Sequence, residues 1–254
     1  VADSSDELQA MIDASQEYNR VFSVHQNRRW DEDYLIMKQI YDEGTLGEVF
    51  SIESRVHGSR GVPGDWRNKK RHGGGMILDW GVHLIDQILQ MIDQDVVSTY
   101  CSVTHVTNDE VDDGFRSVLT FESGITASVE VGTSHFVSLP RWFMCGQNGT
   151  AIMNDWSKQG KIVMVSDWEK RDAVPVVTAA GLTKTMAPRT SETIREYPLP
   201  DVQADVRDYY RNFVRAILGE EKQLVTHAQM TRVMKLMEAM NRSAETNEIV
   251  HARI

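Results

Sequence analysis

The sequence contains little cysteine and proline and no long apolar run. Its 254 residues include two cysteines, Cys101 and Cys145, and six prolines. Two cysteines are too few for a disulfide framework, and these two lack the spacing of a metal site. No apolar stretch approaches the roughly 18–20 residues that a membrane-spanning helix needs. We therefore expect a cytoplasmic protein without a membrane partner.

The chain also lacks an excess of positive charge. It carries 27 Lys and Arg residues against 37 Asp and Glu residues, a formal net charge of −10. Proteins that bind the phosphate backbone usually present a basic face, so we expect no nucleic-acid partner. With 41% hydrophobic and 25% charged residues, the composition excludes the disordered and fibrous classes and suits a chain that buries a sizeable core.

The first 27 residues have the pattern of a helix followed by a short strand. Residues 6–18 place apolar side chains at helical spacing, with Ser4 or Ser5 as the N-cap. Val21-Phe22-Ser23-Val24 is a compact apolar run that suits a buried parallel strand. A helix that leads into such a strand is the closing half of a βαβ unit. The chain opens on Val1 without an initiator Met, so we expect a processed start or a fragment of a longer polypeptide.

The rest of the chain mixes helices with strands joined by hairpins, which indicates an α+β fold with a largely antiparallel sheet. Asn148-Gly149 suits a tight hairpin turn, and Thr226 stands at capping-box spacing from Gln229. Residues 155–200 are expected to form short strands with an exposed loop around 179–191. The predicted helices cover residues 33–42, 75–92, 204–218 and a last segment from 226, and the predicted strands cover residues 50–56, 96–106, 115–121, 125–131, 141–146 and 150–154.

One segment carries the residue types of a catalytic site. It opens with three glycines at 73–75 and continues through Asp79, His83, Asp86 and Gln90. At about 100° per residue these four polar side chains share one helix face, and Asp79 lies one turn from His83. A carboxylate beside an imidazole raises its proton affinity, which suits a proton acceptor near neutral pH. The glycines would let a substrate or cofactor approach the helix N-terminus. On spacing alone, a solvated polar face after a glycine-rich turn is the commoner arrangement.

Other candidates depend on weaker patterns. Arg28, Arg29 and Trp30 follow the predicted strand at 21–24, at the end where α/β sheets bind ligands, although a strand-end salt bridge is equally compatible. The basic loop at 67–72 could attract an anionic cofactor or substrate, but such runs are usually solvated.

Two further groups of residues favour structural interpretations. His57, His105 and His135 lie on or beside predicted strands without mutual ligand spacing, so we expect no metal site. The apolar stripe of the last helix, Met230, Val233, Met234 and Met237, is expected to pack in the core.

The catalytic segment and its flanks resemble a known family. The run Gly73-Gly74-Gly75-x-x-x-Asp79-x-Gly81-x-His83-x-x-Asp86 is similar to the signature of the glucose–fructose oxidoreductase / inositol dehydrogenase family, often called Gfo/Idh/MocA. The flanking matches extend over essentially the whole chain, and their order is more specific than any one of them. They are Asn27-Arg28-Arg29-Trp30, Glu43-Gly44-x-x-Gly47-Glu48-Val49, Trp66-Arg67, Val225-Thr226-His227-Ala228 and Ser243-Ala244.

The resemblance implies a fold and a domain organisation. Family members join a Rossmann domain that binds NAD(P) to a C-terminal domain with an open, mostly antiparallel sheet and helices on one face, similar to that of dihydrodipicolinate reductase. Residues 1–27 would then be the last helix and strand of a truncated nucleotide-binding domain, and residues 28–254 the substrate-binding and oligomerisation domain. A homo-oligomer, a dimer or tetramer through the sheet face, is also implied.

The resemblance further implies an activity and roles for individual residues. The intact protein would be an NAD(P)-dependent dehydrogenase that acts on a secondary alcohol of a sugar or polyol. His83 would accept the hydroxyl proton, with Asp79 orienting the substrate. Trp66 and Arg67 would line the substrate and cofactor pocket, and Arg29 would lie at the cofactor.

The sequence also departs from the family pattern. It contains no G-x-G-x-x-G motif and no Glu-Lys-Pro motif, so the chain alone would lack the main NAD or NADP site and would be inactive. Two other functions therefore stay open. The chain could be a stand-alone binding or oligomerisation module, or it could belong to an NAD-dependent relative that cleaves glycosides.

Overall fold

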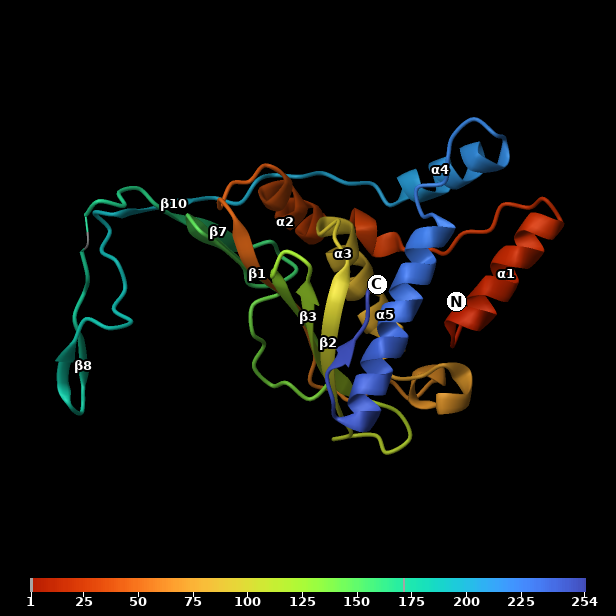
Figure 1. Cartoon of the computed structure of the whole chain (residues 1–254), viewed down its shortest axis with the longest axis horizontal. Helices are drawn as coiled ribbons and strands as arrows, with labels where there is room; N and C mark the ends of the chain where they lie inside the picture. The colour runs from red at the N-terminus through yellow and green to blue at the C-terminus, as the bar shows by residue number, and fades with distance from the viewer. Residues whose placement is uncertain (1, 171) are drawn as a thin grey trace.

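The computed structural model describes residues 2–170 and 172–254, which form one large sheet with helices and a projecting hairpin (Figure 1). Seven of the eight neighbouring strand pairs in this sheet are antiparallel, and the exception is the parallel pair of β1 and β4. In spatial order the strands are β10 (Ile194–Tyr197), β7 (Gly160–Val165), β6 (Gly149–Met153), β5 (Trp142–Gly146), β1 (Val49–His57), β4 (Thr126–Gly132), β3 (Gly114–Phe121), β2 (Val96–Thr104) and β11 (Val250–His251). The large, mostly antiparallel sheet predicted from the sequence is confirmed.

Helices pack against this sheet, and a further helix lies near the N-terminus of the chain. Helix α3 contacts β4, and α5 contacts β2 and β11. The helices are α1 (Ser5–Glu17), α2 (Glu32–Asp42), α3 (Val82–Met91), α4 (Arg207–Ile217) and α5 (His227–Thr246), with short turns η1 (Asn27–Trp30), η2 (Trp66–Asn68), η3 (Lys70–His72) and η4 (Ile77–Gly81). None of the helices in the described ranges is both long and apolar enough to cross a membrane.

The two faces of the sheet differ in polarity because side chains alternate along each strand. On β4, Ala127, Val129 and Val131 are buried on the face that the helices cover. On the opposite face of β3, Arg116 and Val118 are exposed. The sheet therefore has one apolar face packed against helices and one open face.

The N-terminal segment differs from its prediction. Helix α1 is confirmed, and Ser4 caps it by accepting a hydrogen bond from the Glu7 N–H. Residues 21–24 form neither helix nor strand, so the predicted strand is wrong. A strand needs a neighbour, and instead the Phe22 carbonyl accepts a hydrogen bond from the side-chain amide of Gln223. The division at residue 27 stays a prediction, and Val1 lies outside the described residues.

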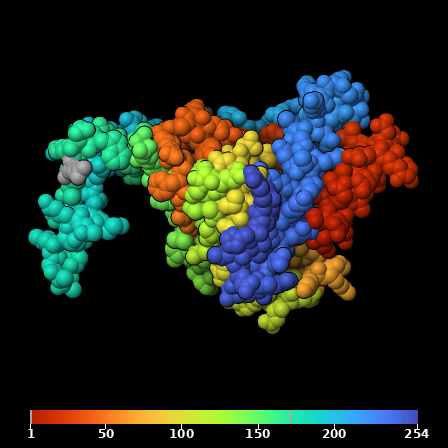
Figure 2. Space-filling view, viewed as in Figure 1, coloured from red at the N-terminus to blue at the C-terminus, as the bar shows by residue number. Residues whose placement is uncertain are grey.

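A hairpin arm projects from the sheet edge formed by β7 and β10. It comprises residues 166–170 and 172–193 and ends in β8 (Val176–Thr178) and β9 (Gly181–Thr183), which pair with each other in a sheet of their own. Figures 1 and 2 show the arm reaching away from the rest of the chain. Its base is held by Asp172, whose carboxylate accepts hydrogen bonds from Thr190 and Thr193.

Candidate active site between two cavities

The segment with Asp79 and His83 forms a π-helical turn that continues into α3. The turn covers Ile77–Gly81, and the Val82 N–H closes it by donating to the Ile77 carbonyl five residues back. Asp79 and His83 share no hydrogen bond, and the Asp79 carboxylate accepts one from Arg67 instead. The predicted carboxylate–imidazole pair is therefore wrong.

Asp79 instead pairs with an arginine from the preceding loop. The Nε of Arg67 donates to Asp79 Oδ2 at 2.9 Å, and its Nη1 bonds Asp65 at 2.9 Å. The basic loop at 67–72 is thus partly neutralised by neighbouring carboxylates, including Glu110 beside Lys69. Arg67 holds the Asp79 carboxylate in a fixed orientation.

His83 lies in surroundings that favour the neutral imidazole. Burial, followed by the positive charge of Arg28 and by nearby His25, lowers the pKa of His83 from 6.5 to about 4. Its buried Nδ1 forms no hydrogen bond with the described residues. The sequence predicted a raised proton affinity, and the structure gives the opposite direction for the pKa because the ring is buried and because Arg28, rather than Asp79, is the next largest influence.

Gly75, the last of the three glycines before the π turn, serves internal packing. Gly75 has φ +105°, and a Cβ there would lie 2.2 Å from Asp112 Oδ1. The Asp112 carboxylate accepts hydrogen bonds from the Met76 and Ile77 N–H groups at 2.8 and 2.9 Å. The N–H groups that were expected to meet a substrate or cofactor are therefore occupied by Asp112, and that expectation is wrong.

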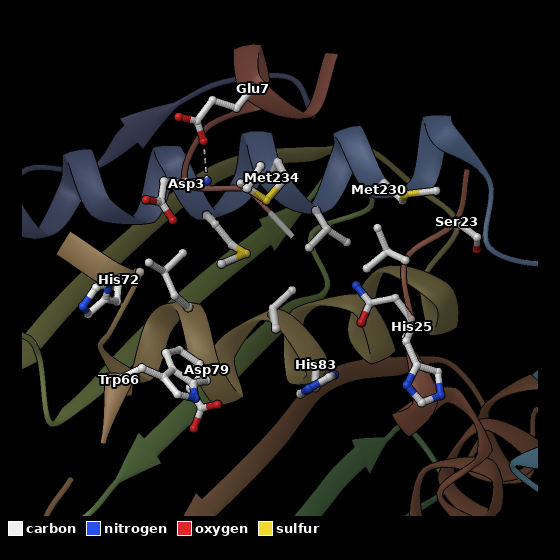
Figure 3. A pocket seen from close by; sticks show the side chains of 18 residues that line it. Asp3, Glu7, Ser23, His25, Trp66, His72, Asp79, His83, Met230 and Met234 are labelled. Atoms are coloured by element: carbon white, nitrogen blue, oxygen red, sulfur yellow. Dashed lines mark hydrogen bonds between the residues drawn. The ribbon is translucent and has the colours of Figure 1, made fainter. Parts of the chain in front are cut away.

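A first cavity lies between this helix, α5 and the N-terminal segment (Figure 3). It has a volume of about 710 Å³ and brings together Asp79, His83, His25 and Trp66. The methionine stripe of α5 lines it from the other side, so these buried side chains face a cavity as well as the core. The lining residues are Ala2, Asp3, Glu7, Ser23, Val24, His25, Gln26, Trp66, His72, Gly73, Leu78, Asp79, Val82, His83, Met230, Val233, Met234 and Met237.

A second cavity of about 740 Å³ lies on the other side of the same two residues. Its wall carries the cations Arg28 and Arg67 and two indoles, Trp80 and Trp156. Its full lining is Arg28, Val56, His57, Gly58, Gly61, Pro63, Arg67, Met76, Asp79, Trp80, His83, Val131, Gly132, Thr133 and Trp156. Asp79 and His83 line both cavities and so stand where the two adjoin.

Arg29 is engaged away from both cavities. Its guanidinium donates to both oxygens of Asp86, at 2.8 and 2.7 Å, and to Gln229 of α5. The side chains of Arg29 and Asp86 are 10% and 2% exposed. Arg29 therefore joins the η1 turn to α3, through Asp86, which was grouped with the polar face of the helix, and to α5.

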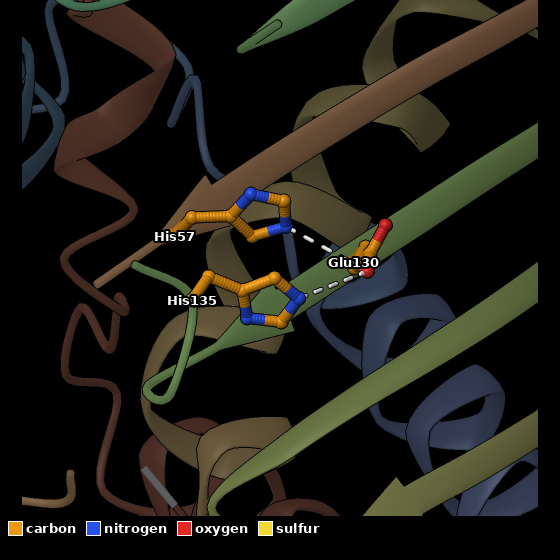
Figure 4. A group of neighbouring side chains, drawn as sticks. All are labelled: His57, Glu130 and His135. Carbon is orange, nitrogen blue, oxygen red and sulfur yellow. Dashed lines mark ion pairs between the residues drawn. The ribbon is translucent and has the colours of Figure 1, made fainter. Parts of the chain in front are cut away.

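Two of the histidines without ligand spacing nonetheless meet on the open face of the sheet (Figure 4). The rings of His57 and His135 stack at 4.0 Å with their planes 4° apart, and Glu130 lies 3.6 and 3.7 Å from their Nε2 atoms. Sequence spacing missed this cluster because β1, β4 and the loop after β4 bring it together. His105 lies elsewhere, beside the Asn108 carbonyl.

The His57–Glu130–His135 cluster is not arranged as a formed metal site. Parallel stacked imidazoles direct their lone pairs side by side instead of toward one ion. The Leu139 N–H donates to His57 Nδ1 at 3.2 Å, which leaves the ring proton on Nε2, the atom that faces Glu130. The carboxylate already accepts hydrogen bonds from Arg55 and Arg116.

Comparison with known proteins assigns the fold to a family. Residues 34–152 match the GFO/IDH/MocA C-terminal domain. The crystal structure of an NAD-binding protein from Listeria innocua is 46% identical with a TM-score of 0.95, and the match covers 99% of this chain and 73% of that protein. The chain belongs to the GFO/IDH/MocA family.

Curated relatives of this GFO/IDH/MocA member are named oxidoreductases. The scyllo-inositol 2-dehydrogenase (NADP(+)) IolW of Bacillus subtilis is 25% identical over 253 residues, covering 97% of this chain and 69% of that protein. The uncharacterized oxidoreductase C115.03 of Schizosaccharomyces pombe is 24% identical over 269 residues, covering 96% of this chain and 71% of that protein. These names support oxidoreductase chemistry for this GFO/IDH/MocA chain.

The structure also brings Arg28, Trp80 and Trp156 to the site, and the sequence patterns had singled out only Arg28. Arg28 and Trp80 lie beside His83, and Trp156 completes the wall of the second cavity. Arg28 was among the candidates that follow the predicted strand at 21–24, whereas Trp80, which lies within the glycine–aspartate–histidine run, was not singled out. Trp156 gave no sequence signal, since it lies in the weakly patterned stretch after 155.

Proposed function

We propose that this protein is an NAD(P)-dependent oxidoreductase that transfers hydride between a secondary alcohol of a sugar or polyol and nicotinamide. The observation that carries the proposal is the position of Asp79 and His83, which line two adjoining cavities. A redox reaction between two bound molecules needs two such sites with an acid–base group where they meet.

His83 is the proton acceptor in this proposal. Its lowered pKa keeps the ring neutral at physiological pH, so a ring nitrogen is free to receive a hydroxyl proton, while the same shift makes the ring a weaker base than an ordinary imidazole. The buried Nδ1 has no hydrogen-bonding partner among the described residues. A substrate hydroxyl that donates to this ring would satisfy a buried polar atom and place its proton for transfer.

Asp79 orients the substrate. Its carboxylate is fixed by Arg67 Nε at 2.9 Å and faces both cavities. Carboxylates bind vicinal hydroxyl groups well because each oxygen accepts more than one hydrogen bond. We assign Asp79, His83 and Arg67 to the substrate through the second cavity.

The first cavity fits a nicotinamide cofactor, NAD or NADP. Its wall combines the indole of Trp66 with apolar methionine side chains and includes His83. The cofactor would supply the hydride acceptor or donor. Trp66 would flank it. Arg29, which was expected at the cofactor, is bound to Asp86 instead, and we do not propose it as a cofactor contact.

The second cavity suits a hydroxyl-rich ring. The indoles of Trp80 and Trp156 offer apolar faces, and Arg28, Arg67 and Asp79 offer hydrogen bonds. This mixture matches the two faces of a sugar or cyclitol, and the name of the relative IolW points to the same class.

The experiment that tests the proposal is a substrate screen of the full-length protein. A panel of aldoses, glycosides and inositols is incubated with NAD+ or NADP+, and reduced nicotinamide is followed by absorbance. We expect turnover with at least one cyclic secondary alcohol. The proposal would be contradicted if none of the ring alcohols produced reduced cofactor and turnover occurred only with another chemical class.

A further inference from the structure

Trp156 is a half-exposed indole in the wall of the second cavity. It lies in the turn after β6 and is 48% exposed. Its position on the same cavity as Asp79 and His83 suggests a role in binding.

The indole is held by a rigid support. The guanidinium of Arg141 lies 4.8 Å from the centroid of the Trp156 ring. Arg141 itself is 3% exposed, forms an ion pair with Asp33 at 3.1 Å and donates to the Ser54 hydroxyl at 2.6 Å. A fixed cation beneath one ring face holds the indole in place.

The aromatic side chains form a series that leads away from His83. The ring of Trp80 meets His83 edge to face, with centroids 6.5 Å apart. The next ring, Trp156, lies 5.9 Å from Trp80 and is tilted by 47°. A substrate ring that reacts at His83 would therefore contact Trp80 first, and whatever is attached to that ring would reach Trp156.

Polar groups accompany this series. Arg28 lies over Trp80 at 4.0 Å and 5.6 Å from Trp156. Its Nη1 donates to Asp31, while its Nε and Nη2 form no hydrogen bond within the described ranges. Two free donors beside two indoles suit a ring that has both hydroxyl oxygens and an apolar C–H face.

We propose that Trp156 forms a second ring-binding subsite, so that the preferred substrate carries a ring attached to the one that reacts, as in a disaccharide or an aryl glycoside. This inference rests on the proposed function for the identity of the reacting ring. The cavity of about 740 Å³ lies in the upper part of the range for ligand sites, which leaves space for a second ring.

The test is a comparison of ligand binding by calorimetry in the full-length protein with cofactor present. The two-ring probes are cellobiose, maltose and phenyl glucoside, and the one-ring probe is methyl glucoside. We expect at least one two-ring probe to bind more tightly than methyl glucoside. Trp156→Ala should weaken that binding about tenfold, which corresponds to about 1.4 kcal/mol, and should leave methyl glucoside nearly unchanged.

Two variants separate stacking from folding. Trp156→Tyr keeps an aromatic face and should retain most of the two-ring affinity. Trp168→Ala is the matched control, because Trp168 is 54% exposed and has Arg189 5.0 Å from its ring but lies on the hairpin arm. It should change neither affinity.

Three results would contradict the proposed subsite. Two-ring probes that bind no more tightly than methyl glucoside would do so. An equal loss of affinity for both probe types in Trp156→Ala, or no loss of affinity for either, would do so as well. Binding is measured independently of turnover, so a failure of the proposed redox chemistry would be recognised separately. In that case no ring alcohol would reduce NAD+ or NADP+, while the ring preference in binding persisted.

Discussion

At the scale of single residues, His83 shows how burial and neighbouring charge decide the state of an ionisable group. The ring is held neutral by burial and by Arg28, and its pKa falls from 6.5 to about 4. An unfolded chain would bind a proton at the ordinary value. Between these two pKa values the unfolded state therefore holds the extra proton, and the folded state loses stability as the pH falls.

This linkage predicts a pH-dependent difference between the wild-type protein and His83→Asn. The wild-type free energy of unfolding should fall by up to about 3 kcal/mol more than that of the variant as the pH drops from 6.5 to 4. Above pH 6.5 the difference between the two should be constant. Urea unfolding at a series of pH values measures this, and parallel curves would contradict the assignment.

The Arg29–Asp86 pair gives a second prediction at this scale. Both side chains are nearly buried, and removing one leaves an unpaired charge inside the protein. We expect Asp86→Ala to lower the free energy of unfolding by about 3–5 kcal/mol. The control is Lys38→Met, which removes an exposed pair with Asp42 and should cost about 0.3–0.5 kcal/mol. Equal losses of unfolding free energy in the two variants would show that the buried pair contributes no more to stability than the exposed pair.

At the scale of elements, the π turn and its support place the candidate catalytic side chains. Asp112, from the loop between β2 and β3, holds the first N–H groups of the turn. Burial raises the pKa of Asp112, and the hydrogen bonds from Met76 and Ile77 oppose this shift. The angle at which Asp79 and His83 face the cavities therefore depends on a residue from another part of the chain.

We predict that Asp112→Ala destabilises the protein by about 2–3 kcal/mol, because two N–H groups lose their acceptor. Turnover should fall as well, since Asp79 and His83 lose their support. Asp112→Asn keeps an acceptor oxygen and should be milder in both measurements. If Ala and Asn behaved alike in denaturant unfolding, the capping role would be wrong.

The elements also show what sequence reasoning could and could not supply. The strands and the Thr226–Gln229 capping box were predictable because alternation and capping are local patterns. The π turn was not, because it depends on Asp112, which lies 36 residues from Met76. The His57–His135 stack was missed for the same reason, since strand pairing creates it. Family resemblance named Asp79 and His83, but not the partners that fix their chemistry.

At the scale of the whole molecule, the hairpin arm is separate from the sheet that builds the site. Strands β8 and β9 pair with each other alone, and Val177, Leu182 and Met186 are at least 75% exposed. The core is formed by the helices and the sheet instead. Fold stability should therefore be independent of the arm tip.

Replacing residues 175–187 with a short glycine–serine turn tests this separation. We expect the free energy of unfolding to change by less than about 0.5 kcal/mol, as for surface changes elsewhere. The Val174–Pro188 hydrogen bond at the base is kept in this variant. A large loss in thermal or urea unfolding would show that the arm contributes to the core.

The two cavities that adjoin at Asp79 and His83 are the whole-molecule feature on which the function depends. The most direct measurement is the turnover of His83→Ala in the full-length protein, together with its affinity for the nicotinamide cofactor. Loss of the proton acceptor should lower kcat by about 10²–10⁴-fold while leaving cofactor affinity nearly unchanged. Turnover equal to that of the wild-type protein would contradict the role of His83 and the account of the site.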